Sequence, residues 1–146
     1  PIFLPFAKDQ VDFVFGHGVL HHLELATARD QMLRVLAPGG RAVFLEPLGH
    51  NPLVRLYRRF TPGERTDDER PLSLSDVELL RTGFSGLHHS EFGFLTLALV
   101  ALRVVLRSPT LWPGLGQALK RIDSRLARML PPMRKWYWVT VIELVR

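Results

Sequence analysis

The chain has 146 residues, of which 47% are hydrophobic and 23% charged, with a formal net charge of +5, and this composition is typical of one globular domain with a real core. It contains no cysteine, which excludes disulfide bonds, zinc–thiolate sites and a cysteine nucleophile, and which fits a cytoplasmic protein. Metal sites built from histidine and carboxylate side chains stay open on composition alone.

The positive charge is concentrated near the C-terminus. Residues 1–98 carry 10 basic and 12 acidic residues, whereas residues 99–146 carry 9 basic and 2 acidic ones. A solvated basic helix face is the more common cause of such an excess, and contact with an anionic partner such as membrane headgroups is the alternative. We therefore keep peripheral membrane contact through the basic C-terminal third as an open interpretation.

The first third of the chain predicts a strand, a helix and a second strand. Residues 11–15 are mostly aromatic or β-branched and stop at a glycine-rich turn, as a short buried strand does. Residues 28–36 carry apolar side chains at helical spacing, and the Pro38-Gly39-Gly40 run is expected to end that helix. Residues 42–45 form a second apolar run. We expect a βαβ unit in a parallel sheet that is covered on both faces.

The middle of the chain predicts a short helix near residues 53–60, a loop of mixed charge and a capped helix. Ser75 and Glu78 have the spacing of a capping box. We therefore expect a helix that starts at Asp76 and stops near Gly83.

The last third predicts two strands around a helical insertion. Residues 87–92 and 136–145 are the expected third and fourth strands. Residues 92–106 are apolar nearly all round, and the helix that follows has one apolar stripe opposite a basic face. The stripe consists of Leu115, Leu119, Ile122, Leu126 and Met129. We expect a lid-like helical insertion at about residues 92–130.

Three segments of the first third occur in an order that resembles a known enzyme family. They are Leu4-Pro5-Phe6, the stretch from Val11 to Leu23 (VDFVFGHGVLHHL) and the stretch from Met32 to Gly40 (MLRVLAPGG). Together they resemble the region around the fourth and fifth strands of small-molecule class I S-adenosylmethionine-dependent methyltransferases. The resemblance covers the first third of the chain well and the last strand loosely. It implies an α/β fold with a partial Rossmann-like sheet, methyltransferase activity and S-adenosylmethionine as the cofactor.

The resemblance also implies that residues 1–146 are the C-terminal part of one methyltransferase domain. In the family, a glycine-rich loop after the first strand and an acidic residue at the end of the second strand hold much of the cofactor, and this sequence has no match to either. Gly16 and Gly18 do not replace that loop, because they follow a segment that resembles the fourth strand and lack the downstream acidic residue. We expect the last four strands of the sheet and an incomplete catalytic domain.

Two segments are the cofactor contacts that the resemblance implies. The turn Leu4-Pro5-Phe6 is expected beside the adenine, and the loop Gly16-His17-Gly18 is expected to border the methionine end of the cofactor. Ligands of open α/β sheets bind beyond the carboxyl ends of the strands, so the loops after the first two predicted strands should converge on one cleft.

Four polar residues in these loops are candidates for the chemistry. Methyl transfer to oxygen or nitrogen uses a base, and His17 and His50 are the candidate bases because imidazole titrates near neutral pH. Glu46 and Asn51 are the candidates on the substrate side. Each has a structural alternative, such as ordinary solvent contact for His17, contact with a helix N-terminus for Glu46 and the start of a helix for Asn51.

The other histidines of the sequence favour structural roles. His21 and His22 stand where a helix begins, so we expect them to cap and pack. His88 and His89 are adjacent on a predicted strand and must point to opposite faces, which argues against a joint metal site. We therefore predict no metal site.

The leading hypothesis is methyl transfer to a small molecule. The apolar segment is open to three interpretations: a lid over a lipophilic acceptor, a contact with a membrane interface, or a helical insertion packed against the sheet. The Asn-Pro-Pro-aromatic motif of methyltransferases that modify nucleobase or glutamine amino groups is absent after the first predicted strand, so nucleic acid is a poor substrate hypothesis. The apolar segment has 15 residues, fewer than the ~20 that span a bilayer as a helix, so no transmembrane segment is predicted. The alternative is a half-domain without catalysis that binds a membrane surface or another protein. A different Rossmann-like enzyme, such as a dehydrogenase, is a third hypothesis.

Overall fold

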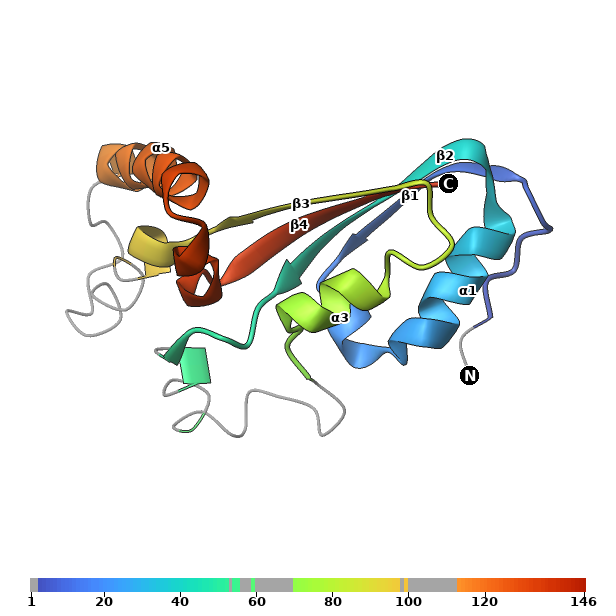
Figure 1. Cartoon of the computed structure of the whole chain (residues 1–146), viewed down its shortest axis with the longest axis horizontal. Coiled ribbons are helices and arrows are strands. Elements are labelled where there is room, and N and C mark those ends of the chain that lie inside the picture. Colours follow the sequence, from blue (N-terminus) through green and yellow to red (C-terminus); the bar gives the residue numbers. More distant parts are fainter. Residues whose placement is uncertain (1–2, 53, 56–58, 60–69, 98, 100–112) are drawn as a thin grey trace.

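The computed structural model describes residues 3–52, 54–55, 59, 70–97, 99 and 113–146. These residues form a four-stranded sheet with two helices packed against one of its faces (Figure 1). β1 and β2 run parallel, whereas β4 is antiparallel to both β2 and β3. The strands are β1 (Val11–His17), β2 (Leu36–Pro47), β3 (Gly86–Phe92) and β4 (Val139–Val145), in the order β1-β2-β4-β3. The expected α/β fold with a partial Rossmann-like sheet is confirmed.

The directions of the strands give the sheet two distinct edges. Because β3 and β2 are both antiparallel to β4, the carboxyl ends of β1, β2 and β3 lie at the same edge. We call this the carboxyl edge and the opposite one the amino edge. Ligands of related open sheets bind at the carboxyl ends of the strands, so the carboxyl edge is where a functional site is expected.

The predicted βαβ unit is present at the start of the chain. α1 (Leu25–Val35) connects β1 to β2 and is capped by Glu24, whose carboxylate accepts the backbone N–H groups of Ala26 (3.0 Å) and Thr27 (2.6 Å). Hydrogen bonds from Thr27, and then the one from Ala26, lower the pKa of Glu24 because they favour its charged form.

The junction between α1 and β2 is tighter than the sequence predicted. Leu36 follows the helix directly and already pairs with Val11, so the Pro38-Gly39-Gly40 run lies inside β2. The ladder resumes with Arg41 opposite Phe13, and the residues between bulge out of it. The prediction that this run separates the helix from the strand is therefore wrong.

α3 (Leu74–Leu79) begins two residues earlier than the sequence predicted. Its N-cap is Ser73, whose Oγ accepts the backbone N–H of Asp76 (3.1 Å), while the Asp76 carboxylate accepts the backbone N–H of Ser73 (2.8 Å). The capping box predicted for Ser75 and Glu78 is therefore wrong. An aspartate at the third helical position closes this box as a glutamate would.

α1 and α3 cover the same face of the sheet and build the hydrophobic core with it (Figure 1). Alternate residues of the strands point into this core, which includes Ala28, Met32, Ala42, Phe44, Val77, Leu87, Ile142 and Leu144. On the other face of β1, Phe13 and Phe15 are 56% and 65% exposed. For the part of the chain that is described, the expectation of a sheet covered on both faces is wrong at β1, the outermost strand of the sheet.

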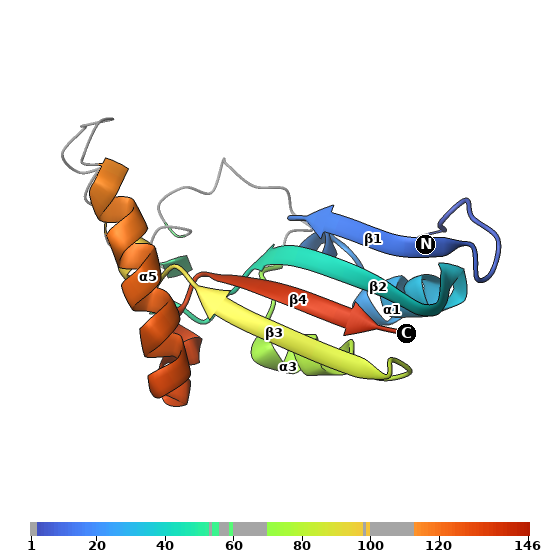
Figure 2. The same cartoon turned by 90° about the horizontal axis from the view of Figure 1, so that it is seen from above.

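α5 (Pro113–Met129) crosses the carboxyl edge beside β3 (Figure 2). Only part of its predicted apolar stripe is buried, since Leu119 and Leu126 are partly covered. Three other members of the stripe, Leu115, Ile122 and Met129, are 36%, 45% and 76% exposed. The buried face is instead centred on Asp123, whose carboxylate accepts the backbone N–H of Leu95 (2.8 Å).

The C-terminal strand begins later than predicted. η3 (Pro131–Trp136) precedes β4, so Trp136 belongs to a 3₁₀ helix and the strand starts at Val139. Most of the predicted helix near residues 53–60, nearly all of the loop that follows it and about half of the apolar 92–106 segment lie outside the described residues. Within the parts of the chain that are described, no helix has the length and hydropathy that crossing a membrane requires.

Candidate active site

The loop after β1 makes a tight turn at the carboxyl edge. The N–H of Gly18 donates to the carbonyl of Leu45 (2.9 Å), and Gly18 has a φ of 62°, a conformation that glycine adopts readily. A Cβ on Gly16 would lie 2.5 Å from the Phe44 ring and 2.8 Å from the Val19 side chain. The two glycines that the sequence singled out therefore let this loop stay close to β2.

Glu46 anchors the same loop from the end of β2. Its side chain is fully buried, and its Oε1 accepts the backbone N–H groups of Val19 (2.9 Å) and Leu20 (2.9 Å). Its Oε2 accepts the backbone N–H of His21 (3.4 Å) and lies 2.8 Å from His21 Nδ1. The structural alternative for Glu46, contact with a helix N-terminus, is what the structure shows, because these N–H groups start η1 (Leu20–His22).

His21 is a site residue that the sequence analysis did not select. Its side chain is only 8% exposed and its Nδ1 faces the Glu46 carboxylate. Sequence patterns did not single it out from His22, because the partner that distinguishes it stands 25 residues later at the end of another strand. The one available signal was an acidic residue at the end of β2, which the topology brings beside the loop after β1.

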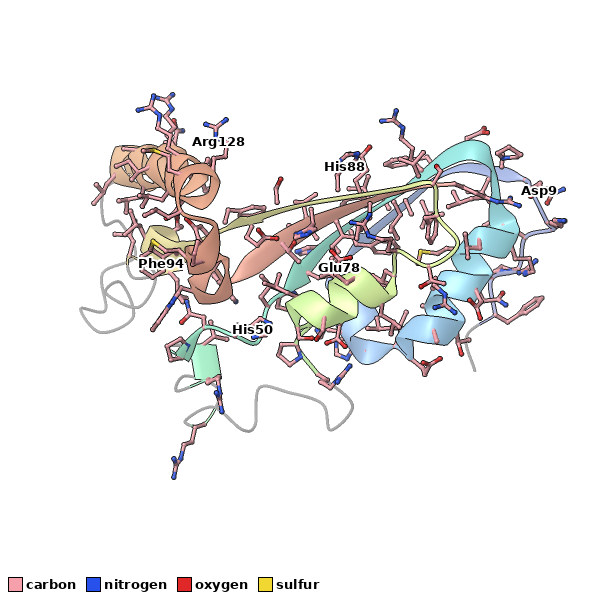
Figure 3. All side chains as sticks on the ribbon, in the orientation of Figure 1. Asp9, His50, Glu78, His88, Phe94 and Arg128 are labelled. Carbon is pink, nitrogen blue, oxygen red and sulfur yellow. The ribbon has the colours of Figure 1, made fainter. Side chains whose placement is uncertain are left out.

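His50 and Asn51 follow β2 and make structural contacts. His50 lies close to the start of α3 (Figure 3), and its Nε2 accepts the backbone N–H of Leu74 (2.9 Å). Asn51 is 1% exposed, donates from Nδ2 to the carbonyl of Trp136 and accepts the N–H of Val54 at Oδ1 (3.4 Å). Both residues therefore hold the loop after β2 against its neighbours.

His17 ends β1 on a different side of the sheet from Glu46. Side chains of a strand alternate between faces, so His17 shares the face of Phe13 and Phe15, away from α1 and α3. His17 is exposed. The two predicted bases are thus not brought together, since His50 is bound to the start of α3 and His17 belongs to the other face.

The Leu4-Pro5-Phe6 turn lies at the amino edge. Arg34, in the last turn of α1, donates to the carbonyls of Leu4 (2.8 Å) and Phe6 (2.7 Å) and holds the turn there. The β1 residues Val11 to Phe15 lie between this turn and Gly16, and by themselves they span roughly 17 Å at the usual rise of a strand. The structure therefore does not bring the two predicted cofactor segments together.

A hollow of about 290 Å³ opens beside η1. Its lining combines ionisable and apolar side chains, namely Leu20, His21, His22, Leu23, Glu24, Leu25, Arg70 and Leu72. The backbone N–H of Arg70 donates to the His21 carbonyl (2.9 Å), which ties the two sides of the hollow together. This volume is near the lower end for small-ligand sites.

A second imidazole–carboxylate pair lies across the sheet on β3. His89 Nδ1 contacts the buried carboxylate of Glu91, and its Nε2 lies 4.0 Å from Glu78 Oε1, so both ring nitrogens face carboxylates. Nearby, the Tyr137 hydroxyl donates to the Asp123 carbonyl (3.0 Å). Burial raises the pKa of Tyr137, and the negative charges of Asp123 and Glu91 raise it further.

The described residues contain no group of three or more histidine and acidic side chains placed to hold a metal ion. His88 and His89 do point to opposite faces, and His88 lies on the face away from α1 and α3 (Figure 3). The polar groups that the described residues present at the carboxyl edge include backbone N–H groups, imidazoles and the buried carboxylates of Glu46 and Glu91.

Comparison with known proteins gives a family match for the N-terminal part of the chain. Residues 2–44 match a family model described as a methyltransferase domain. This segment runs through β1, the loop after it, α1 and most of β2, and so includes the Gly16-His17-Gly18 loop. No sequence among characterised proteins matches the chain.

Solved structures extend the likeness over nearly the whole chain. Phosphoethanolamine N-methyltransferase 2 of Haemonchus contortus, solved with S-adenosyl-L-methionine, superposes with a TM-score of 0.59 at 14% identity, over 97% of this chain and 34% of that protein. Geranyl diphosphate C-methyltransferase from Streptomyces coelicolor A3(2) gives a TM-score of 0.55 at 17% identity, over 98% and 49%. The cyclopropane synthase MmaA2 of Mycobacterium tuberculosis gives 0.53 at 18% identity, over 95% and 56%.

These matches show a shared fold. The chain has the class I S-adenosylmethionine-dependent methyltransferase fold and spans about a third to just over half of the length of these structures.

Proposed function

We propose that this chain, which carries part of a class I S-adenosylmethionine-dependent methyltransferase fold, contributes to methyl transfer from S-adenosylmethionine to a small molecule. The observation that carries the proposal is the match of residues 2–44 to the methyltransferase domain, because this segment supplies the loop at the carboxyl edge. The hollow beside that loop is of a size that suits a small acceptor and supports the same proposal.

The loop after β1 fits the methionine end of the cofactor. Gly16 packs directly against Phe44 and Val19 and so keeps the end of β1 close to β2. Gly18 turns the chain with a positive φ, and a Cβ there would lie 3.6 Å from the His21 ring, so the backbone at Gly18 has room for close approach. When bound, S-adenosylmethionine supplies an electrophilic methyl group on a sulfonium, and the protein has to align the acceptor and exclude water. Because Leu4-Pro5-Phe6 lies at the amino edge, the proposed site includes Gly16-His17-Gly18 and does not include that turn.

Binding of S-adenosylmethionine tests this proposal most directly. We expect the backbone N–H resonances of Gly16, Gly18 and Leu20 to shift on titration in ¹H–¹⁵N spectra. Because the sequence has no match to the family's glycine-rich loop, we expect a dissociation constant on the order of 1 mM, about 4 kcal/mol of binding free energy. Shifts centred on the amino edge, or no shift at the carboxyl edge at several times that concentration, would contradict the proposal. Micromolar affinity at the same amides would instead overturn the expectation of an incomplete site.

Two glycines provide a matched pair of variants for this titration. Gly18 and Gly39 both have positive φ values, 62° and 78°, and a Cβ on either would have no contact closer than 3.6 Å. Alanine at either position should therefore cost a similar amount, roughly 1–2 kcal/mol of backbone strain. Gly18→Ala should weaken S-adenosylmethionine binding, and Gly39→Ala, at the other edge, should not.

A second candidate function, contact with an anionic membrane surface, is favoured by the exposed stripe of α5. Leu115, Ile122 and Met129 recur every seven residues and lie on one side of the helix. Arg121, Arg125 and Arg128 occupy the adjoining side and are exposed, and Figure 3 shows Arg128 pointing away from the sheet. An apolar stripe beside basic side chains is typical of helices that lie in a membrane interface.

Vesicle binding tests the membrane candidate. We expect the chain to co-sediment with vesicles of phosphatidylserine and phosphatidylcholine, and less so in high salt. Replacement of Arg121, Arg125 and Arg128 by glutamine should reduce this binding. A control with the same loss of charge replaces Lys8, Arg41 and Arg81, which are exposed elsewhere. Equal losses in both triple variants, or binding that ignores salt, would contradict a specific role for α5.

A further inference from the structure

We propose that His21 is the proton acceptor of this site and that Glu46 is its positioning residue. The inference rests on the proposed function, which it deepens by naming the class of acceptor: a small molecule that presents an O–H or N–H group to His21 Nε2. In the reaction, a lone pair of the acceptor oxygen or nitrogen forms the new bond to the methyl carbon while the carbon–sulfur bond breaks, and that electron pair stays on sulfur. The proton of the acceptor moves to His21 Nε2 and then to water.

The contacts of Glu46 fix the tautomer of His21. Both carboxylate oxygens accept hydrogen bonds from backbone N–H groups of Val19, Leu20 and His21, as an ionised carboxylate does. An ionised carboxylate has no hydrogen to donate, so the 2.8 Å contact with His21 Nδ1 requires that the hydrogen is on Nδ1. The neutral ring therefore carries its lone pair on Nε2, which is the form that a general base needs.

His21 Nε2 is left without a hydrogen-bonding partner in the part of the chain that the structure describes, although the side chain is only 8% exposed. Nearly buried polar atoms are usually hydrogen-bonded, so an imidazole lone pair in this state indicates a place for a donor from outside the chain. His21 is one of the residues that line the hollow beside η1, and the hollow has room for such a donor.

The chemistry of the hollow suits a small acceptor with an apolar part. Leu23 and Leu72 line it together with His21, His22 and Arg70. Arg70 is also paired with Asp76 at 3.0 Å, so its positive charge is already balanced within the chain. A neutral donor such as an alcohol, a phenol or an aromatic amine therefore fits this lining better than a multiply charged anion.

The other candidate bases at the carboxyl edge lack this arrangement. His50 Nε2 already accepts the N–H of Leu74, and His17 lies on the opposite face of the sheet from Glu46. Of His17, His21 and His50, His21 is the one whose ring has a buried carboxylate partner at Nδ1 and no hydrogen-bonding partner at Nε2 among the described residues.

A pair of probes that differ only in the hydrogen to be donated tests this inference. Phenol can donate an O–H to His21 Nε2, whereas anisole, its methyl ether, has the same ring and no donor. Long-range ¹H–¹⁵N spectra of the histidine rings report which nitrogen carries the hydrogen and whether the other accepts one. We expect Nδ1 of His21 to be protonated in the free chain, and the Nε2 resonance to move with phenol and to stay in place with anisole.

Several outcomes would overturn the proposal. Hydrogen on Nε2 in the free chain would contradict the assigned tautomer, and equal responses to phenol and anisole would show that the ring nitrogen accepts nothing. Glu46→Gln should reduce the fraction of His21 that carries hydrogen on Nδ1; an unchanged fraction would remove Glu46 as the positioning residue. If that variant does not fold, the two probes on the natural sequence still decide the matter.

The inference and the proposed function fail separately in these experiments. S-adenosylmethionine is followed at the amides of Gly16 and Gly18. Phenol is followed at the ring of His21 in the natural sequence and, in both the natural sequence and His21→Gln, at the backbone amides of Leu23 and Leu72, which line the hollow. We expect His21→Gln to keep the S-adenosylmethionine response and to lose the phenol response. Loss of the S-adenosylmethionine response in the natural sequence would overturn the function, whereas a phenol response that survives in His21→Gln would overturn only the assignment of His21.

Discussion

The two faces of the sheet differ in what the rest of the chain does with them. On the face under α1 and α3, strand side chains such as Phe44 and Ile142 are buried in a continuous core. On the other face, Phe15 is 65% exposed, and Arg41 forms an ion pair with Glu143 (3.0 Å) across neighbouring strands. Phenylalanines on neighbouring strands are thus buried on one face and exposed on the other, because α1 and α3 cover only one face.

This comparison also separates the candidate site residues. Glu46 follows Phe44 by two positions and so belongs to the covered face, where burial makes each of its hydrogen bonds important. His17 belongs to the other face with Phe15. The covered face therefore supplies the rigid imidazole–carboxylate pair, and the other face supplies an exposed histidine at the end of β1.

Truncation of one phenylalanine on each face should give the largest difference. Phe44→Ala removes a ring that is 4% exposed and should lower the free energy of unfolding by about 3–5 kcal/mol. Phe15→Ala removes a ring already in contact with solvent and should change it by less than about 0.5 kcal/mol. Urea unfolding of both variants measures this. Similar losses would show that the second face is packed in solution, for instance by another copy of the chain.

Removal of one glutamate from each face should give the next largest effect. Glu46→Ala leaves three backbone N–H groups and the His21 ring without their acceptor, which should cost about 3 kcal/mol because unsatisfied buried donors are expensive. Glu143→Ala breaks a partly exposed ion pair with Arg41 and should cost between about 0 and 1 kcal/mol. Thermal and urea unfolding of the two variants would show whether Glu46 has this structural weight; equal costs would contradict it.

A pair of serines sharpens the boundary of the helix that covers the core. Ser73→Ala removes the observed N-cap of α3 and should cost about 1 kcal/mol. Ser75→Ala should cost less, since Ser75 lies within the helix and its Oγ is hydrogen-bonded, among the described residues, to the Ser73 Oγ alone (2.7 Å). A larger loss for Ser75→Ala, measured by urea unfolding, would restore the boundary that the sequence predicted.

The sequence alone predicted which helices and strands form better than it predicted where they begin and what packs against them. The strand at residues 87–92 and the βαβ unit follow from composition and periodicity, which are local properties of the chain. The start of α3 did not, because Ser73 with Asp76 and Ser75 with Glu78 satisfy the same spacing rule and only packing decides between them. Coverage of β1 also escaped prediction, since an apolar strand has the same pattern whether or not a second layer lies over it.

The site was predicted at the level of loops and missed at the level of atoms. The carboxyl ends of β1 and β2 do converge, and Glu46 does stand beside the Gly16-His17-Gly18 loop, as parallel pairing requires. The pairing of Glu46 with His21 depends on where η1 lies relative to the end of β2, and no residue spacing in the sequence predicts that position. Candidate roles for His17, His50, Glu46 and Asn51 in catalysis or substrate binding stay predictions.

The pH dependence of the α3 cap should be the smallest of these effects. Burial by itself would raise the pKa of Asp76, but hydrogen bonds from Ser73 and the ion pair with Arg70 outweigh it, so the pKa of Asp76 in the folded chain lies below its usual value of 3.8. A carboxyl with a lowered pKa stabilises the fold fully above its unfolded pKa, and this contribution is lost as the pH falls through its folded pKa. The difference in unfolding free energy between the natural sequence and Asp76→Asn should therefore be constant from about pH 5 to 8 and shrink below about pH 4. Asp30→Asn, an exposed change of equal charge on α1, serves as the control, and a difference for Asp76→Asn that persists at pH 2 would show that the side chain acts through its shape rather than its charge.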